Sequence, residues 1–396
     1  MGYRSLATKP ILTWGLVAMC ARLPVAMAPL ALVFLVRERP GGYAWGAALA
    51  AAYVVGEVAG AAVLGTLLRP ERARLQLAVG LVAGAAAFAA LGAFPDAPRV
   101  VQGAFAVCAG AAPAAAPGGL RALLLQLAED TGEGLTAKAL SAESVMGYLL
   151  WAVSPALVTG LALGVSASLP MLLAAVLMAL PAGGMWLLPR GRAADTADEP
   201  GVSKARTLAG AWPIYVSGAA SMALLALAEL LLPALLEQRG IAVGWSGPLL
   251  AGYSLATAVG AFVYGLRNWP GRLRTQCLVL LPSIAVCVAA VAVLPVIGGL
   301  TVALLTAGVL AAGVQVARGL SLREALPTSA LAAGYSVSYA VVGAGYAATA
   351  LLSGAVLDVA APSTAILCGV ALMLVLTGVS ALGELRRVPG RVVVTG

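Results

Sequence analysis

The chain has 396 residues, of which 61% are hydrophobic and only 10% are charged, and its formal net charge is +8. Soluble globular proteins carry about 25% charged residues, so this composition excludes an ordinary soluble domain and indicates a protein built for lipid. The sequence has no histidine, and its five cysteines show no metal-ligand spacing, which excludes histidine-based catalysis and most zinc or haem sites. We therefore expect no cofactor and no metal.

Apolar runs recur along the whole chain, and each has the length of about 18 or more residues that a transmembrane helix needs. The predicted spans are 11–36, 43–67, 75–94, 98–124, 138–164, 168–188, 209–236, 246–266, 275–294, 299–322, 328–357 and 363–385. The sequence thus predicts an all-α membrane protein with twelve transmembrane helices.

The basic residues set the predicted orientation. Most of the 24 lysines and arginines fall at the ends of spans that share a side with both chain termini. Because cytoplasmic loops are enriched in lysine and arginine, we expect both termini to be cytoplasmic. The positive net charge is thereby explained without nucleic acid as a partner.

The longest polar stretch, PRGRAADTADEPGVSKARTL, divides the chain into two halves of six spans. Its proline, glycine and mixed charges without apolar periodicity are typical of a linker. We predict a six-helix bundle over residues 1–188, a cytoplasmic linker over 189–208 and a second six-helix bundle over 209–396.

The two halves repeat one pattern. A shift of 200 residues aligns the second span and its following loop with the eighth. The matched residues of uncommon type are Trp45 and Trp245, Tyr53 and Tyr253, Pro70 and Pro270, Arg72 and Arg272, and Arg74 and Arg274. Since an even number of spans separates the repeats, they share one orientation, as in a large class of transporters.

These features together resemble the major facilitator superfamily over the whole chain. The stretch ARLPVAMAPLALVFLV resembles the first span of a bacterial branch of efflux and solute carriers. The resemblance implies two parallel six-helix repeats around a central cavity lined by spans 1, 4, 7 and 10. It also implies a gating role for the basic loops after spans 2 and 8, which would fall to Arg72, Arg74, Arg272 and Arg274.

Two motifs depart from the pattern of this superfamily. In the loop GTLLRPERAR, Arg69 stands where the family has an acidic residue, so a gating role of that acid does not carry over. In span 5, SPALVTG keeps Pro155 and Gly160 of the antiporter motif but has Ser154 where glycine is usual.

Arg22 lies within the first predicted span, where a permanent cation costs at least about 2.5–3.5 kcal/mol on insertion scales. At about 1.5 Å per helical residue, Arg22 and Glu57 of the second span lie at similar depth, and a short loop makes these spans neighbours. We therefore predict that Glu57 is the partner of Arg22. The pair would either fix the packing of the two spans or exchange a proton or substrate charge during transport.

Two further acids are candidates for proton coupling. Glu143 lies about five residues into span 5, where it is either a solvated helix-end residue near Arg121 or Lys138 or a member of the pathway. Glu229 lies in the outer part of span 7 and shares a helical face with Met222 and Tyr215. The candidate substrate-binding residues are Arg22, Tyr53, Met222, Glu229 and Tyr253.

Arg318 lies near the inner end of span 10. We expect it to be an anchor whose charged end reaches the membrane surface.

The sequence favours a secondary transporter over a membrane-embedded enzyme, a channel or a receptor. It contains no G-x-x-x-x-G-K-[ST] motif for ATP hydrolysis and no paired aspartates at a membrane face. We expect proton-coupled export of a small amphiphilic molecule by antiport, because carboxylates outnumber the deep arginine and methionines supply an adaptable lining. The alternative is proton-coupled uptake of a small anionic solute. The expected partners are the substrate, protons and lipid, for a monomer in the bacterial inner membrane.

Overall fold

The computed structural model describes residues 3–39, 42–132, 134–189, 204–242, 245–267, 269–357 and 360–385. Every regular element in these ranges is a helix. The long helices of the first half are α1 (Lys9–Val36), α2 (Gly42–Thr66), α3 (Ala73–Ala93), α4 (Arg99–Ala111), α5 (Ala116–Thr131), α6 (Leu135–Gly164) and α7 (Leu169–Gly184). The second half contains α8 (Lys204–Gly210), α9 (Trp212–Gln238), α10 (Ser246–Leu266), α11 (Leu273–Val293), α12 (Ile297–Ala325), α13 (Leu331–Leu357) and α14 (Pro362–Leu385). The prediction of an all-α chain is confirmed for the described residues.

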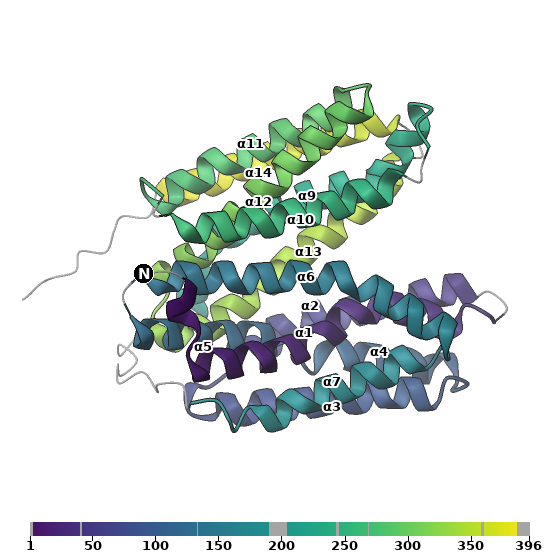
Figure 1. Cartoon of the computed structure of the whole chain (residues 1–396), viewed down its shortest axis with the longest axis vertical. Helices are drawn as coiled ribbons and strands as arrows, with labels where there is room; N and C mark the ends of the chain where they lie inside the picture. Colours follow the sequence, from purple (N-terminus) through teal and green to yellow (C-terminus); the bar gives the residue numbers. More distant parts are fainter. Residues whose placement is uncertain are drawn as a thin grey trace, which may run out of the picture.

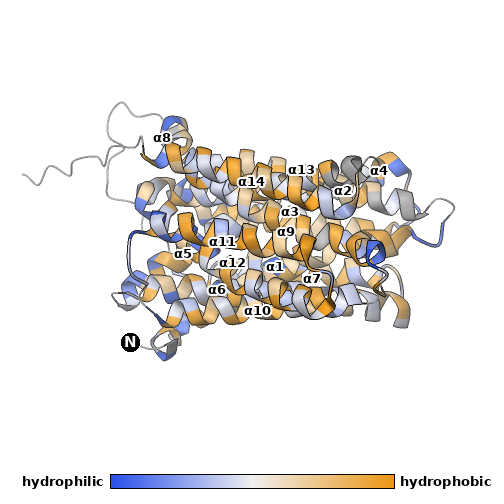
Figure 2. Ribbon diagram, turned by 90° about the horizontal axis from the view of Figure 1, so that it is seen from above, coloured by the Kyte–Doolittle hydropathy of each residue, from blue (hydrophilic) through white to orange (hydrophobic). Residues whose placement is uncertain are grey.

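The helices suit a membrane. Ten helical segments in the described ranges are long and apolar enough to span a bilayer, with α4 and α5 counted as one segment. Apolar residues run along the sides of the bundle, and hydrophilic residues gather at its two ends (Figure 2). The shorter α7 is also apolar, and α13 has 27 residues. The exact number of twelve spans stays a prediction.

The fourth predicted span is interrupted. Residues Ala112–Ala115 form a turn between α4 and α5, and α5 continues to Thr131, seven residues beyond the predicted end at 124. Pro113 in this turn lacks a backbone N–H and cannot continue a regular helix. Two glycines of α3 make room for this turn, since an added Cβ would lie 2.4 Å from the Ala112 carbonyl oxygen at Gly80 and 3.0 Å from the Pro113 ring at Gly84. The turn therefore divides the fourth predicted span into α4 and α5.

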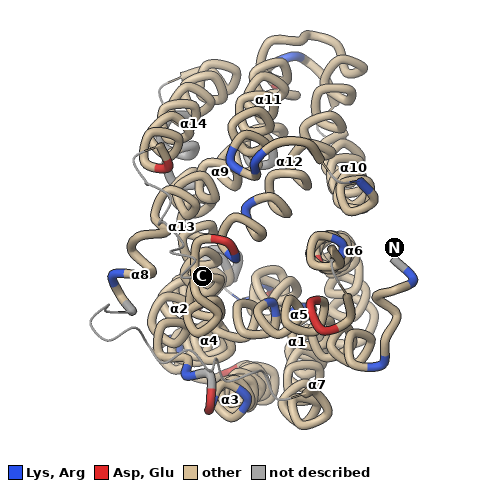
Figure 3. Tube along the Cα trace, turned by 90° about the vertical axis from the view of Figure 1, so that its left-hand side faces the viewer, with Lys and Arg blue, Asp and Glu red and all other residues tan. Residues whose placement is uncertain are grey.

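Each half has its own apolar core. One buried cluster draws its members from Leu6 to Leu188, and another from Ala220 to Met373. The two groups of helices lie one above the other, with α6 and α13 between them (Figures 1 and 3). The division into bundles at 1–188 and 209–396 stays a prediction, because residues 190–203 of the predicted linker lie outside the described ranges.

A third cluster joins the halves at one end of the bundle. We call this the terminal end, because α1 begins and α14 ends there. The cluster packs Leu125 of α5 and Leu140 of α6 against second-half residues that include Tyr215, Leu322 and Tyr335. At the same end, an added Cβ at Gly118 of α5 would lie only 2.2 Å from Ser336 Oγ of α13. The halves are therefore in close contact at the terminal end.

Candidate functional site between the halves

A cavity of about 220 Å³ lies between the two halves. Helices α1, α5 and α6 of the first half and α9, α12 and α13 of the second half line it. Three arginines, Arg22, Arg121 and Arg318, line this cavity together with one carboxylate, Glu143. The described lining therefore carries more positive than negative charge.

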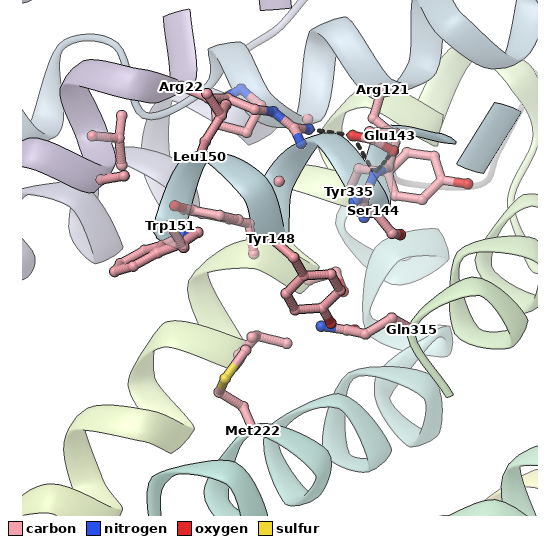
Figure 4. Close-up of a pocket in the computed structure, with 18 of the residues that line it drawn as sticks. Arg22, Arg121, Glu143, Ser144, Tyr148, Leu150, Trp151, Met222, Gln315 and Tyr335 are labelled. Atoms are coloured by element: carbon pink, nitrogen blue, oxygen red, sulfur yellow. Dashed lines mark hydrogen bonds and ion pairs between the residues drawn. The ribbon is translucent and has the colours of Figure 1, made fainter. Parts of the chain in front are cut away.

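Glu143 is the centre of a buried ion triad (Figure 4). Its side chain is fully buried, and it accepts hydrogen bonds from Arg121 Nε at 3.0 Å to Oε1 and 2.8 Å to Oε2. Arg22 Nη2 also donates to Glu143 Oε1. The three residues come from α5, α6 and α1, so the triad ties three first-half helices together. Two guanidinium groups on one carboxylate leave a net charge of +1.

The predicted partner of Arg22 was wrong. The structure pairs Arg22 with Glu143 and not with Glu57. The depth estimate was insufficient because depth along a helix does not determine which way a side chain faces. Glu143 is also not a solvated helix-end residue, since it is only 1% exposed. The suggested proximity of Glu143 to Arg121 is confirmed.

Glu57 instead faces the second half. Its Oε1 accepts a 2.7 Å hydrogen bond from the hydroxyl of Tyr339 on α13. Tyr339 lines the cavity, whereas Glu57 does not. Glu57 is half-buried, and its hydrogen bond with the cavity residue Tyr339 joins α2 to α13.

Arg318 is not an anchor at the membrane surface. It is only 6% exposed and lines the cavity. Its Nη1 donates to the Ser217 carbonyl oxygen at 3.3 Å, and its Nη2 donates to Gln315 Oε1 at 2.8 Å. Although Arg318 is near the end of α12, its guanidinium does not reach the surface, because this side of α12 faces the cavity.

Of the remaining candidate residues, some line the cavity and others do not. Met222 lines the cavity beside Tyr148 and Gln315 (Figure 4). Tyr53 and Tyr253 are buried and do not belong to the cavity lining. The side chain of Glu229 lies outside the described residues, so its proposed place on the pathway stays a prediction.

Sequence reasoning missed Tyr335 and Tyr339. The four-residue spacing puts both on one face of α13, and this pattern was available in the sequence. Tyr335 lies under Arg121, with the guanidinium carbon 5.7 Å from the ring centroid, and donates a 2.7 Å hydrogen bond to the Gly319 carbonyl. Thus one tyrosine contacts the triad and the other contacts Glu57.

Two of the four proposed gating arginines make contacts within their own halves. Arg74 donates to the Leu188 carbonyl oxygen, and Arg274 donates to the Ala381 carbonyl oxygen at 3.1 Å. Arg274 also pairs with Glu384 at 3.3 Å. Arg72 and Arg272 are exposed. The equivalent contacts of Arg74 and Arg274 support the parallel repeat, and their role in gating stays a prediction.

The fold is similar to that of solved transporters. The crystal structure of the human organic anion transporter MFSD10 (TETRAN) aligns with a TM-score of 0.71 and 14% sequence identity, covering 96% of this chain and 100% of that chain. The major facilitator superfamily transporter FucP, in its outward conformation, aligns with a TM-score of 0.71 and 15% identity, covering 98% of this chain and 100% of that one. No protein-family model and no curated protein sequence matches the chain. The chain is a multi-pass membrane protein with the major facilitator fold, as its sequence predicted.

Proposed function

We propose that this chain, which has the fold of major facilitator transporters, is a secondary transporter that moves a small organic anion by alternating access. The observation that carries the proposal is the charge of the cavity between the halves, whose described lining has three arginines and one carboxylate. Alternating access requires a binding site that both halves share, and this cavity has walls from both.

The cavity favours the anionic solute over the amphiphile. The preference for amphiphile export rested on an excess of carboxylates over the one deep arginine. Within the described lining this ratio is reversed, because Arg121 and Arg318 join Arg22 there and Glu57 lies outside. A lining with net positive charge attracts anions and raises their local concentration. The similarity to a protein described as an organic anion transporter supports the same substrate class.

Glu57 remains the leading candidate for proton coupling. Glu143 has two guanidinium partners that hold its negative charge, so a proton on it would leave both cations without a counter-charge. Among the described residues, Glu57 is not paired with a cation, and it accepts one neutral hydrogen bond from Tyr339. A proton on Glu57 would therefore change the contact between α2 and α13 without dismantling the triad.

The proposed setting is the bacterial inner membrane, with both termini in the cytoplasm. Net movement of an anion with protons would be uptake, and exchange of protons for substrate would be export. The proposal commits to uptake with protons, because co-transported protons offset the charge of an anionic substrate. We propose a monomer, since the cavity is formed within one chain.

The test uses the purified chain in sealed proteoliposomes. Uptake of a radiolabelled small carboxylate should rise several-fold under an inward proton gradient and fall when a protonophore collapses it. Empty liposomes and a neutral amide of the same carbon skeleton are the controls. Equal transport of the acid and its amide would contradict the proposal that the substrate is an anion. Transport at an unchanged rate after addition of the protonophore would contradict proton coupling.

A further inference from the structure

Arg318 is a buried cation without a counter-ion among the described residues. Its hydrogen bonds to Ser217 and Gln315 go to neutral oxygens, those of the backbone carbonyl and the side-chain amide. Its Nε is buried and has no partner. Arginine cannot shed its proton in a protein, so the charge persists. Because an unpaired buried charge is costly, it calls for a nearby anion.

The other two cavity arginines differ in this respect. Arg22 and Arg121 share the carboxylate of Glu143, so their charge is partly neutralised within the chain. The triad also joins three helices, which gives it a structural role. Arg318 has the full charge and no such partner in the described part of the structure, and this singles it out as the docking group for a solute.

The surroundings are shaped to hold this guanidinium. An added Cβ at Gly218 of α9 would lie 3.0 Å from both Cζ and Nη1 of Arg318 and 3.1 Å from the Val342 side chain. Contacts this short would displace the guanidinium by a few tenths of an ångström. A glycine at this position therefore leaves the space that the guanidinium occupies.

Two polar groups stand beside Arg318. Gln315 directs its oxygen to Arg318 Nη2 and its amide nitrogen to the phenol of Tyr148, which leaves one amide N–H to donate elsewhere. The phenol of Tyr148, from α6 of the other half, lies beside this amide (Figure 4). The three side chains offer guanidinium, amide and hydroxyl donors to one anionic group, and they come from both halves of the chain.

Apolar side chains also line the cavity, which is small. They include Met222, Leu225 and Trp151. The cavity volume of about 220 Å³ is below the roughly 300–1,000 Å³ of pockets for drug-sized ligands, so it suits a small solute. The guanidinium of Arg318, the apolar lining residues and the small volume together suit a small monocarboxylate.

We propose that Arg318, Gln315 and Tyr148 form the carboxylate-binding site for a small apolar monocarboxylate, whose hydrocarbon part lies against Met222 and Trp151. Arginine matches a carboxylate in geometry and can donate two parallel hydrogen bonds to it. This assignment rests on the proposed function, because it presumes that the solute in the cavity is an anion.

The test measures binding to the full-length protein in detergent by calorimetry and thermal shift. Benzoate is the probe, benzamide is its neutral counterpart and inorganic phosphate is a different anion. Benzoate should bind the wild type, and benzamide should bind at least tenfold more weakly. The Kd for benzoate should rise at least tenfold in Arg318→Gln and stay within twofold in the control Arg206→Gln, whose arginine is exposed on α8.

Two further readouts separate binding from a structural role. Without ligand, Arg318→Gln should melt at or above the wild-type temperature, since it removes an unpaired buried charge. A purely structural arginine would give a lower melting temperature. Gly218→Ala keeps the charge but displaces the guanidinium, so it should raise the Kd for benzoate several-fold, and this variant serves if Arg318→Gln does not fold.

The possible results distinguish this inference from the proposed function. Equal benzoate affinity of the wild type and Arg318→Gln would overturn the assignment of Arg318. The proposal that the protein transports an anion would be unaffected. Binding of phosphate without benzoate would overturn the carboxylate class alone. Absence of binding for every anion tested would overturn both proposals.

Discussion

Tyr339 Oη lies 2.7 Å from Glu57 Oε1 and joins α13 of the second half to α2 of the first half. This hydrogen bond exists only while these two helices are in contact. The hydroxyl belongs to a cavity residue, whereas the acid lies outside the cavity. A change in the cavity and a change at Glu57 can therefore act on the same interface.

Removing this hydroxyl should shift the balance between conformations. A hydrogen bond of this kind contributes about 0.5–1.5 kcal/mol net, so Tyr339→Phe should favour the state with α2 and α13 apart by roughly fivefold. Spin-label distances between the terminal ends of these helices would measure the populations. Tyr53→Phe is the control, because it removes a hydroxyl of α2 that has no hydrogen-bond partner among the described residues. Equal distributions for both variants would contradict the prediction.

Neutralising Glu57 should uncouple transport from protons. Glu57→Gln keeps the size and a hydrogen-bond acceptor but cannot take up or release a proton. We expect it to exchange substrate at a rate near that of the wild type and to lose the several-fold stimulation by an imposed proton gradient. Proteoliposome uptake with and without the gradient measures this. If the variant is still stimulated as strongly as Glu237→Gln, which changes an exposed acid, Glu57 is not the carrier.

The triad predicts strong coupling of Arg22 to Glu143 and none to Glu57. Removal of one member of a buried ion pair costs about 3–5 kcal/mol, because the remaining charge is left uncompensated. Glu143→Gln should therefore lower the melting temperature clearly, and addition of Arg22→Gln should recover part of that loss.

A double-mutant cycle measures this coupling. Arg22→Gln and Glu57→Gln should instead have additive effects on the melting temperature, because these residues share no contact in the structure. If the effects on the melting temperature were additive for Arg22 with Glu143 and non-additive for Arg22 with Glu57, Glu57 would be the partner of Arg22 instead.

A side chain at Gly118 should open the terminal end. An added Cβ there would lie 2.2 Å from Ser336 Oγ and 2.7 Å from its backbone nitrogen, so α5 and α13 cannot keep their present distance. Gly118→Val should shift the spin-label distances between α5 and α13 toward longer values. Gly160→Val is the control, since nothing lies within 4 Å of a Cβ at that glycine. An unchanged distance in Gly118→Val would show that this contact does not close the terminal end.

The loop arginines should differ in effect despite their proximity. Arg274 contacts the Ala381 carbonyl and Glu384 within its own half, whereas Arg272 is exposed. Arg274→Ala should therefore lower the melting temperature by several degrees, and Arg272→Ala should leave it within about one degree. If Arg272→Ala changes the spin-label distances between the halves, the gating role predicted for this loop gains support.

The sequence by itself determined the long helices and the class of fold. Apolar runs of about 20 residues can satisfy their backbone groups in lipid only as helices, so the run lengths were sufficient to predict most spans. The match between Arg74 and Arg274 was also visible in the sequence, and both make equivalent contacts with a backbone carbonyl. These are local properties, because a run of residues and its neighbours on one helix decide them.

Only the tertiary structure decided which side chains meet. Alanine and glycine cover all sides of these helices, so no apolar stripe indicates which way Arg22 or Glu57 faces. Arg22 meets Glu143 across a separation of 121 residues, and Glu57 meets Tyr339 across 282. Such pairs depend on the rotation of each helix about its axis and on the contact between the halves. Packing of whole helices sets both, so the charge of the cavity and the isolation of Arg318 emerged only from the folded chain.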